Sequence, residues 1–303
     1  MILSDCLDRD LWNALKAGRF RVHLGGLCLK IGSVVPEFVA AFRQLYADHP
    51  VSLEGGAYDF DIGISPPAIW RRWFRRNVTF EFSGDAPFQP MEVGHAHALF
   101  EWGLNWTIAS SLHNYLILHS AVVEWKDCGV LLSAVSGSGK STLSAELTLQ
   151  GWRLLSDELA LIDQELQVSP LSRPVSLKNS SIDLIRSRHP AAIIGPLARD
   201  THKGTIGHLK APPSSVTQNC RSAIPKLIVF PKWTAESPLR VQPVDAGLAA
   251  MRLIDQAFNY SILGTEGFRR LVALVRAAEA WEIEYSSLDE ARDALETLVD
   301  ECG

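Results

Sequence analysis

The sequence predicts an α/β fold in two parts, a smaller α+β domain over residues 1–92 and a larger domain over residues 93–303. The larger domain is indicated by an apolar run at 129–134 that enters a glycine-rich loop and then a helical pattern. A second short apolar run at 226–231 reads as a buried strand of the same domain. The smaller domain is indicated by two strand-like runs within 20–31 that meet at a Gly-Gly pair, which is a hairpin signal.

The smaller domain is expected to combine short strands with a helix. Pro36 suits the first turn of that helix, and apolar residues recur behind it at helical spacing. A second helix, with tryptophans and leucines three and four residues apart, is expected to bridge the two domains. The expected elements are strands at 20–24, 27–31, 58–64 and 78–82, and helices at 36–47 and 95–116.

The larger domain is expected to begin with a hairpin that feeds the glycine-rich loop. Gly151 stands where a helix C-cap glycine belongs, Pro231 is expected to stop its strand, and Ser287 opens a capping box. Residues 197–217 are polar and aperiodic, which predicts a long loop. The expected elements are strands at 119–125, 129–134, 152–156, 159–162, 166–168, 226–231 and 281–285, and helices at 139–150, 246–258, 265–280 and from 287.

The glycine-rich loop, AVSGSGKS at 134–141, matches the phosphate-loop pattern G-x-x-x-x-G-K-[ST] everywhere except at Ala134. Its glycines permit backbone angles at which N–H groups turn inward around an anion, and the following helix directs its positive dipole end there. Lys140 supplies a charge to the β and γ phosphates, and the Ser141 hydroxyl is the usual magnesium ligand. The residues expected to bind ATP are Ser136, Gly137, Ser138, Gly139, Lys140, Ser141 and Thr142.

Two acids, Asp157 and Glu158, end the strand expected at 152–156. Beside a phosphate loop, one carboxylate can hold magnesium while the other accepts the proton of an attacking hydroxyl. Neighbouring residues of an extended strand point to opposite sides, so the two acids are expected to have different roles. Asp163 is a rival metal ligand, but residues 163–165 read better as a hairpin turn.

Three stretches resemble the catalytic domain of HPr kinase/phosphorylase, namely HSAVVE from 119, the phosphate loop, and RLLSDE from 153. The chain is more similar to the HPr-kinase-related kinases called type A, through EWGLNW from 101, RPVSLKN from 173, DTHKG from 200 and FNYSILG from 258. This resemblance implies a P-loop-containing catalytic domain of the HPr-kinase and phosphoenolpyruvate-carboxykinase type.

The resemblance also implies roles for individual residues. Asp157 falls on the catalytic base, Glu158 on an acid near the metal and phosphates, and His119 on a histidine close to the base. A glutamate of the family falls on Thr201, so either Asp200 takes over its metal contact or that ligand is missing. Basic side chains after Thr201 are suited to contact a phosphoryl group during its transfer. The alternative is that they belong to an exposed basic loop. Lys203 and His208 are these candidate contacts. Lys178, earlier in the chain, is a further candidate phosphate or substrate contact, with a merely structural role as its alternative.

Composition argues against several classes of function. A formal charge of −5 and a pI near 6.0 argue against a nucleic-acid binder, and the arginines and aromatics interleaved at 69–77 are interpreted as a structural or interface element. The acidic N-terminus is unlike a signal peptide, and no apolar run is long enough to span a membrane. Five scattered cysteines indicate neither a disulfide framework nor a zinc site, which favours a cytoplasmic location.

The leading hypothesis is an ATP- and Mg²⁺-dependent kinase that transfers the γ-phosphoryl group to a hydroxyl, expected to be a serine, of a protein or peptide. Asp157, His119 and Lys140 are the expected catalytic residues, and Ser141 and Glu158 are the expected metal ligands. A nucleotide-binding scaffold without phosphoryl transfer is the alternative. The resemblance implies a peptide acceptor and a PqqD-like peptide chaperone as companion, and it leaves a homo-oligomer open.

Overall fold

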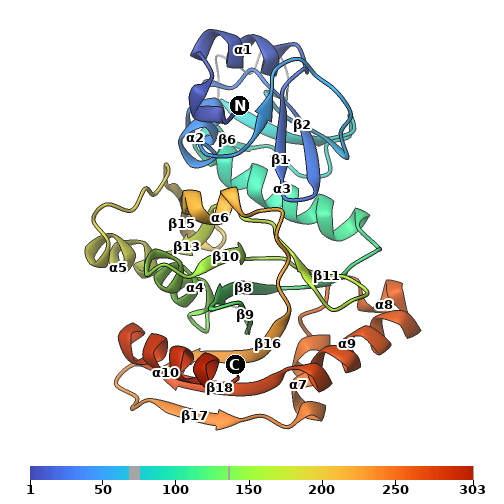
Figure 1. Cartoon of the computed structure of the whole chain (residues 1–303). Coiled ribbons are helices and arrows are strands. Elements are labelled where there is room, and N and C mark those ends of the chain that lie inside the picture. The colour runs from blue at the N-terminus through green and yellow to red at the C-terminus, as the bar shows by residue number, and fades with distance from the viewer. Residues whose placement is uncertain (68–75, 136, 303) are drawn as a thin grey trace. The chain divides into compact units, whose positions relative to one another are not determined.

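The computed structural model describes residues 1–67, 76–135 and 137–302, and the chain forms two compact units (Figure 1). Unit 1 comprises Met1–Ile108 and Ser176–Thr217, and unit 2 comprises Ala109–Val175 and Gln218–Gly303. The boundary expected at 92/93 does not coincide with this division, because a later segment of the chain returns to the N-terminal unit.

Two features singled out in the sequence fall outside the described residues. Ser136, expected to bind ATP, is one of them. The interleaved arginine and aromatic stretch at 69–77 is the other, apart from Arg76 and Asn77. Among the described residues, no helix combines the length and the apolar character that crossing a membrane requires.

The N-terminal part of unit 1 is built on a mixed sheet. Its elements are η1 Leu3–Asp5, α1 Asp8–Lys16, β1 Arg21–Leu24, β2 Leu27–Ser33, α2 Pro36–Leu45, β3 Val51–Ser52, β4 Phe60–Ser65, β5 Asn77–Phe82, β6 Met91–Glu92, η3 Val93–His95 and α3 Ala96–Ser111. The strands lie in the order β3-β1-β2-β4-β5-β6. The expected hairpin is confirmed, since β1 and β2 pair antiparallel around Gly25, whose φ of 60° suits glycine. Rings of α2 and α3 pack together, with Phe38 and Phe42 against Phe100.

The expectation of a long loop at 197–217 is wrong. This later part of unit 1 contains β13 Val175–Lys178, α5 Ser180–Arg188, β14 Ala198–Thr201, β15 Gly204–Leu209 and α6 Pro213–Thr217. The strands form a sheet in the order β13-β15-β14, and Thr201 Oγ1 closes the β14–β15 turn by donating to the Gly204 carbonyl at 2.7 Å. The sequence pattern did not predict this hairpin because its residues are polar. Pairing with β13, rather than an apolar pattern, holds it in the sheet.

Unit 2 is built on a second mixed sheet. Its elements are β7 Leu116–Leu118, β8 Ser120–Trp125, β9 Cys128–Ser133, α4 Lys140–Leu149, β10 Arg153–Ser156, β11 Ala160–Ile162, β12 Val168–Ser169, β16 Pro225–Trp233, β17 Arg240–Pro243, α7 Ala246–Ile254, α8 Tyr260–Leu263, α9 Thr265–Ala277, β18 Glu279–Tyr285 and α10 Leu288–Glu301. The strand order is β10-β8-β9-β16-β18-β17, with β12-β11-β7 as a smaller sheet. Strands β9, β16 and β18 run parallel. Because β10 and β9 are both antiparallel to β8, the carboxyl ends of β9, β10, β16 and β18 meet at one edge.

Apolar strands and helices bury this sheet. Every residue of β9 is buried, which explains why its sequence is a continuous apolar run. Leu131 and Ile228 belong to a core cluster with residues of α7 and α9, while α4 contacts β8, β9, β10 and α10 (Figure 1). Gly151 follows α4 with a φ of 101°, which confirms the expected C-cap. The side chain of Ser287 caps α10 as expected.

Strand β16 does not stop at Pro231 as expected but continues to Trp233. Its pairing with β9 has already ended at Val229, so the missing N–H of Pro231 does not interrupt that ladder. Pairing with β18 continues from Leu227 to Trp233. The two extra residues bring Trp233 to the edge of the sheet at which the phosphate loop begins.

Candidate functional site

The phosphate loop leaves β9 at the carboxyl edge of the unit 2 sheet and enters α4. Gly137 and Gly139 have φ values of 92° and 88°, in the left-handed region that favours glycine. A Cβ at Gly137 would meet nothing within 4 Å. A Cβ at Gly139 would lie 2.8 Å from Tyr285 Oη and 2.9 Å from Trp233 Cβ. Packing therefore requires glycine at 139, whereas Gly137 borders open space.

Two aromatic residues that were not among the expected site residues brace this loop. The Trp233 backbone N–H donates to the Ser138 carbonyl at 3.0 Å, and the Tyr285 hydroxyl donates to the Gly139 carbonyl at 3.5 Å. Burial raises the pKa of Tyr285 well above its usual value, so the phenol stays protonated and remains a donor. The signal that could have found them is position, because each ends a strand that runs parallel to the strand of the phosphate loop.

Lys140 and Asp157 meet at the same edge. Lys140 is the first residue of α4 and is buried, with Nζ 3.4 Å from the backbone carbonyl oxygen of Asp157. Asp157 follows β10 directly, and 5% of it is exposed. The Ser156 hydroxyl accepts a hydrogen bond from the Leu159 N–H at 3.2 Å, which closes the tight turn that carries both acids. The sheet order thus brings the lysine and the acid of the sequence motif together.

Glu158 and His119 form a second contact at this edge. His119 Nε2 lies 3.0 Å from Glu158 Oε2, and both side chains are partly exposed. The His119 backbone N–H donates to the Gln256 carbonyl at 2.7 Å, and its ring packs against Phe258 with centroids 5.8 Å apart. Asp157 is buried while Glu158 reaches a partly exposed partner, so the two neighbouring acids lie in different environments.

The oxygen donors at this edge fit magnesium. Ser141 lies in the first turn of α4 with its side chain partly exposed, and Glu158 offers a partly exposed carboxylate. Magnesium is commonly held by one or two protein oxygens together with substrate phosphates and water. Across the ranges 1–67, 76–135 and 137–302, no group of three or more histidine, cysteine or acidic side chains could hold a metal ion.

The candidate contacts Lys178, Lys203 and His208 belong to unit 1, whereas the phosphate loop and the two acids belong to unit 2. Lys203 is exposed in the β14–β15 turn, with Nζ 6.0 Å from the centroid of the Trp102 ring. Lys178 ends β13 and is half-buried. His208 is 2% exposed and its ring packs on His97 with centroids 4.9 Å apart. The residues proposed below all belong to unit 2, so His208 has no part in that proposal.

The chain matches no protein-family model, and no curated protein matches it. Among solved structures it is similar to the HPr(Ser) kinase/phosphatase from Coxiella burnetii, with 15% sequence identity and a TM-score of 0.28. The match covers 61% of this chain and 94% of that chain. Because a TM-score of this size carries no argument about function, the proposal below rests on the geometry of the site and on the sequence motif.

Proposed function

We propose that this protein is an ATP- and Mg²⁺-dependent kinase that transfers the γ-phosphoryl group to a hydroxyl, in our view a serine, of a protein or peptide. One observation carries the proposal. The phosphate loop, Lys140 and Asp157 meet at one edge of the sheet, with Lys140 Nζ 3.4 Å from the Asp157 carbonyl oxygen. An anion-binding loop with its lysine beside a buried acid suits phosphoryl transfer, in which catalysis consists mainly of positioning and charge stabilisation.

The residues at this edge have different roles in such a reaction. Loop N–H groups, the N-terminus of α4 and Lys140 hold the phosphates. Asp157 accepts the proton of the acceptor hydroxyl as its oxygen bonds to the γ-phosphorus and the bond to the β-phosphate oxygen breaks, which releases ADP. Ser141 and Glu158 would hold magnesium, which when bound neutralises charge on the β and γ oxygens. His119 orients the Glu158 carboxylate through their 3.0 Å contact.

Our choice of a peptide as the phosphate acceptor rests only on the resemblance of the sequence motifs. The type A kinases that the sequence resembles tend to accompany a PqqD-like peptide chaperone, and related enzymes phosphorylate lasso precursor peptides. We therefore propose a peptide acceptor, with a PqqD-like chaperone as the partner that presents it. A mixture of serine-containing peptides is therefore the probe of choice for transfer, beside water as the simplest acceptor.

Replacing Asp157 with Asn tests the proposed base. Asn keeps the shape of the side chain but cannot take the proton, so we expect affinity for Mg-ATP to stay within about threefold of wild type. Phosphoryl transfer should fall by about 10²- to 10⁴-fold, the usual contribution of a general base. Binding is measured by calorimetry, and transfer from γ-labelled ATP to water and to the peptide mixture.

Asp163→Asn is the matched control. Asp163 lies in the β11–β12 turn, where its Oδ1 accepts a hydrogen bond from the Gln167 N–H at 2.8 Å, and asparagine keeps that acceptor. Neither binding nor transfer should change in this variant. Equal losses of binding and of transfer in Asp157→Asn would contradict the assignment of the base.

A nucleotide-binding scaffold is the second candidate, and Thr201 favours it. This residue replaces the glutamate of the family pattern, and its hydroxyl already donates to the Gly204 carbonyl within the β14–β15 turn. A wild-type protein that binds Mg-ATP, yet releases no labelled phosphate and labels no peptide, would be a scaffold of this kind.

A further inference from the structure

The strand order of unit 2 sets a direction for a nucleotide bound at the phosphate loop. Strands β8 and β10, whose ends carry His119, Asp157 and Glu158, lie on one side of β9. Strands β16 and β18 lie on its other side. In open α/β sheets, ligands lie across the carboxyl ends of the strands. A nucleotide with its terminal phosphate toward the acids therefore extends its ribose and base over the ends of β16 and β18.

Trp233 stands at that place. It is the last residue of β16, and its backbone N–H donates to the Ser138 carbonyl at 3.0 Å, so the side chain starts directly beside the loop. The indole Nε1–H donates to the Ser286 carbonyl at 3.3 Å, which holds the ring in one orientation. Even so, 50% of the residue is exposed. An indole that is both fixed and exposed is prepared to pack against a flat partner at low cost in side-chain entropy.

We propose that the Trp233 indole is the platform on which the base of a nucleoside triphosphate stacks. This inference rests on the kinase function proposed above, because the function sets the direction of the phosphate chain. Every nucleobase has a π face, so stacking contributes affinity without reading hydrogen-bonding groups. ATP and GTP are both expected to use the platform.

If the Trp233 side chain only supported the phosphate loop, its removal would have a different effect on ligand binding. The hydrogen bond to Ser138 uses the backbone, and the atom close to Gly139 is Cβ, so both contacts survive in Trp233→Ala. That variant removes the indole together with its bond to Ser286 and leaves the backbone contact with the loop in place. Loss of stacking weakens ligands that carry a base, whereas a disturbed loop weakens every polyphosphate.

Calorimetric titrations with Mg-ATP and with Mg-tripolyphosphate separate the two roles. We expect Trp233→Ala to weaken Mg-ATP binding about tenfold, which is about 1.4 kcal/mol, and to change Mg-tripolyphosphate binding less than twofold. Trp233→Phe keeps an aromatic face and should retain most of the affinity. Phe268→Ala removes an aromatic side chain of similar exposure, 52%, from α9 and should change neither ligand. Tryptophan fluorescence should be quenched by ATP in wild type and less in Trp233→Phe.

The outcomes separate this inference from the proposed function. If Trp233→Ala weakens both ligands equally, or leaves Mg-ATP affinity unchanged, the platform is overturned while nucleotide binding stands. If the wild-type protein binds tripolyphosphate as tightly as ATP, the base adds nothing and the platform is again overturned. If the wild-type protein binds neither ligand, the proposed function fails and the platform fails with it.

Discussion

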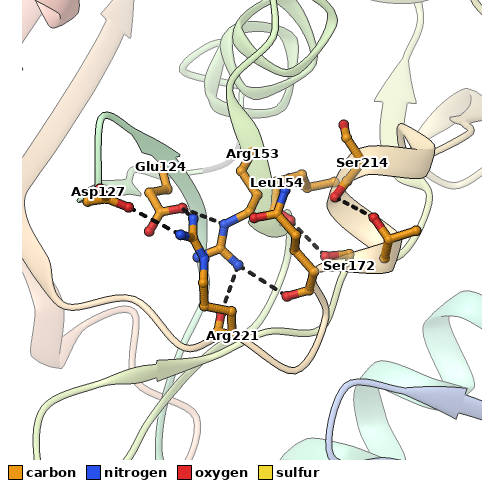
Figure 2. A network of polar contacts seen from close by, with 9 residues as sticks. Glu124, Asp127, Arg153, Leu154, Ser172, Ser214 and Arg221 are labelled. Atoms are coloured by element: carbon orange, nitrogen blue, oxygen red, sulfur yellow. Dashed lines mark hydrogen bonds and ion pairs between the residues drawn. The ribbon is translucent and has the colours of Figure 1, made fainter.

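Strands β8 and β10 carry charged residues at both of their ends, and the two ends differ in how those charges are used. At the end remote from the phosphate loop, the buried carboxylate of Glu124 accepts hydrogen bonds from Arg153 Nε and from Arg221 Nη2 (Figure 2). Arg153 Nη1 also donates to the Arg221 carbonyl at 2.7 Å, and Arg221 Nη1 reaches Asp127 at 3.2 Å (Figure 2). At this end the buried carboxylate of Glu124 and the buried guanidinium of Arg153 are paired with each other, with Arg221 and with a backbone carbonyl.

The phosphate-loop end also buries charged residues but surrounds them differently. Lys140 and Asp157 are buried there, beside a loop in which Gly137 borders open space and the Trp233 indole is half exposed. Buried charge by itself therefore does not identify a binding site, since both ends have it. The distinguishing feature is the loop beside the charges, in which Gly137 borders open space.

The largest effect on stability is expected from Glu124→Ala, which tests whether the remote end is structural. The change leaves the buried Arg153 guanidinium and its neighbour Arg221 without their shared carboxylate, and breaking a buried ion pair costs about 3–5 kcal/mol. We expect the free energy of unfolding, measured in urea, to fall by about 3 kcal/mol because Arg221 is half exposed. Affinity for Mg-ATP should be unchanged under conditions where the variant is folded.

Asp127→Ala is the control for this end of the strands. The Asp127 side chain is 85% exposed, so its pairing with Arg221 should be worth less than about 1 kcal/mol. Equal destabilisation by the two variants would show that burial does not distinguish these carboxylates.

A smaller effect, on binding, is expected from Gly139→Ala. The new Cβ meets Tyr285 Oη at 2.8 Å and Trp233 Cβ at 2.9 Å, and the φ of 88° is strained for alanine. Together these should weaken Mg-ATP binding about 30-fold, which corresponds to about 2 kcal/mol. Gly137→Ala has the backbone strain but no overlap, so about fivefold is expected there. A larger loss in Gly137→Ala than in Gly139→Ala would contradict this account of the loop.

Glu158→Gln should affect metal dependence more than stability. Its contact with His119 is partly exposed, so the free energy of unfolding should fall by less than about 1 kcal/mol. Loss of a carboxylate near the phosphates should raise the Mg²⁺ concentration for half-maximal ATP binding about tenfold, since Mg²⁺ prefers charged oxygen ligands. Glu165→Gln, on the exposed β11–β12 turn, is the control that should leave the Mg²⁺ dependence unaltered. An unshifted Mg²⁺ titration in Glu158→Gln would remove this residue from the metal site.

The smallest effect concerns the thiol of Cys128 at the packed end of β9. Burial raises the pKa of Cys128 to about 11, so at pH 8 the reactive thiolate is scarce. A thiol reagent followed by peptide mass mapping should label exposed Cys220 first and Cys128 only after unfolding. The raised pKa also stabilises the folded state below pH 9, and this contribution is lost as the pH rises through about 11. Labelling of Cys128 as fast as Cys220 would show that this end opens readily.

Local signals predicted many of the elements correctly. The hairpin at Gly25-Gly26, the strand and helix on either side of the phosphate loop, and the cap at Ser287 were all expected, because turn chemistry and capping act within a few residues. The expected end of β16 at Pro231 and the expected loop at 197–217 were wrong. Both depend on which strand lies alongside, and neighbours in a sheet are not encoded locally.

The sequence by itself determined which groups the site could use. The loop motif with Lys140 and Ser141, and the acid pair at 157–158, are patterns within short stretches whose chemistry depends only on residue type and spacing. The tertiary structure alone decided which groups meet, because strand order depends on burial and pairing between distant segments. It brings His119 to Glu158 from 39 residues away and Tyr285 to Gly139 from 146 residues away. It also leaves the Trp233 indole exposed beside the loop, which no local pattern predicted.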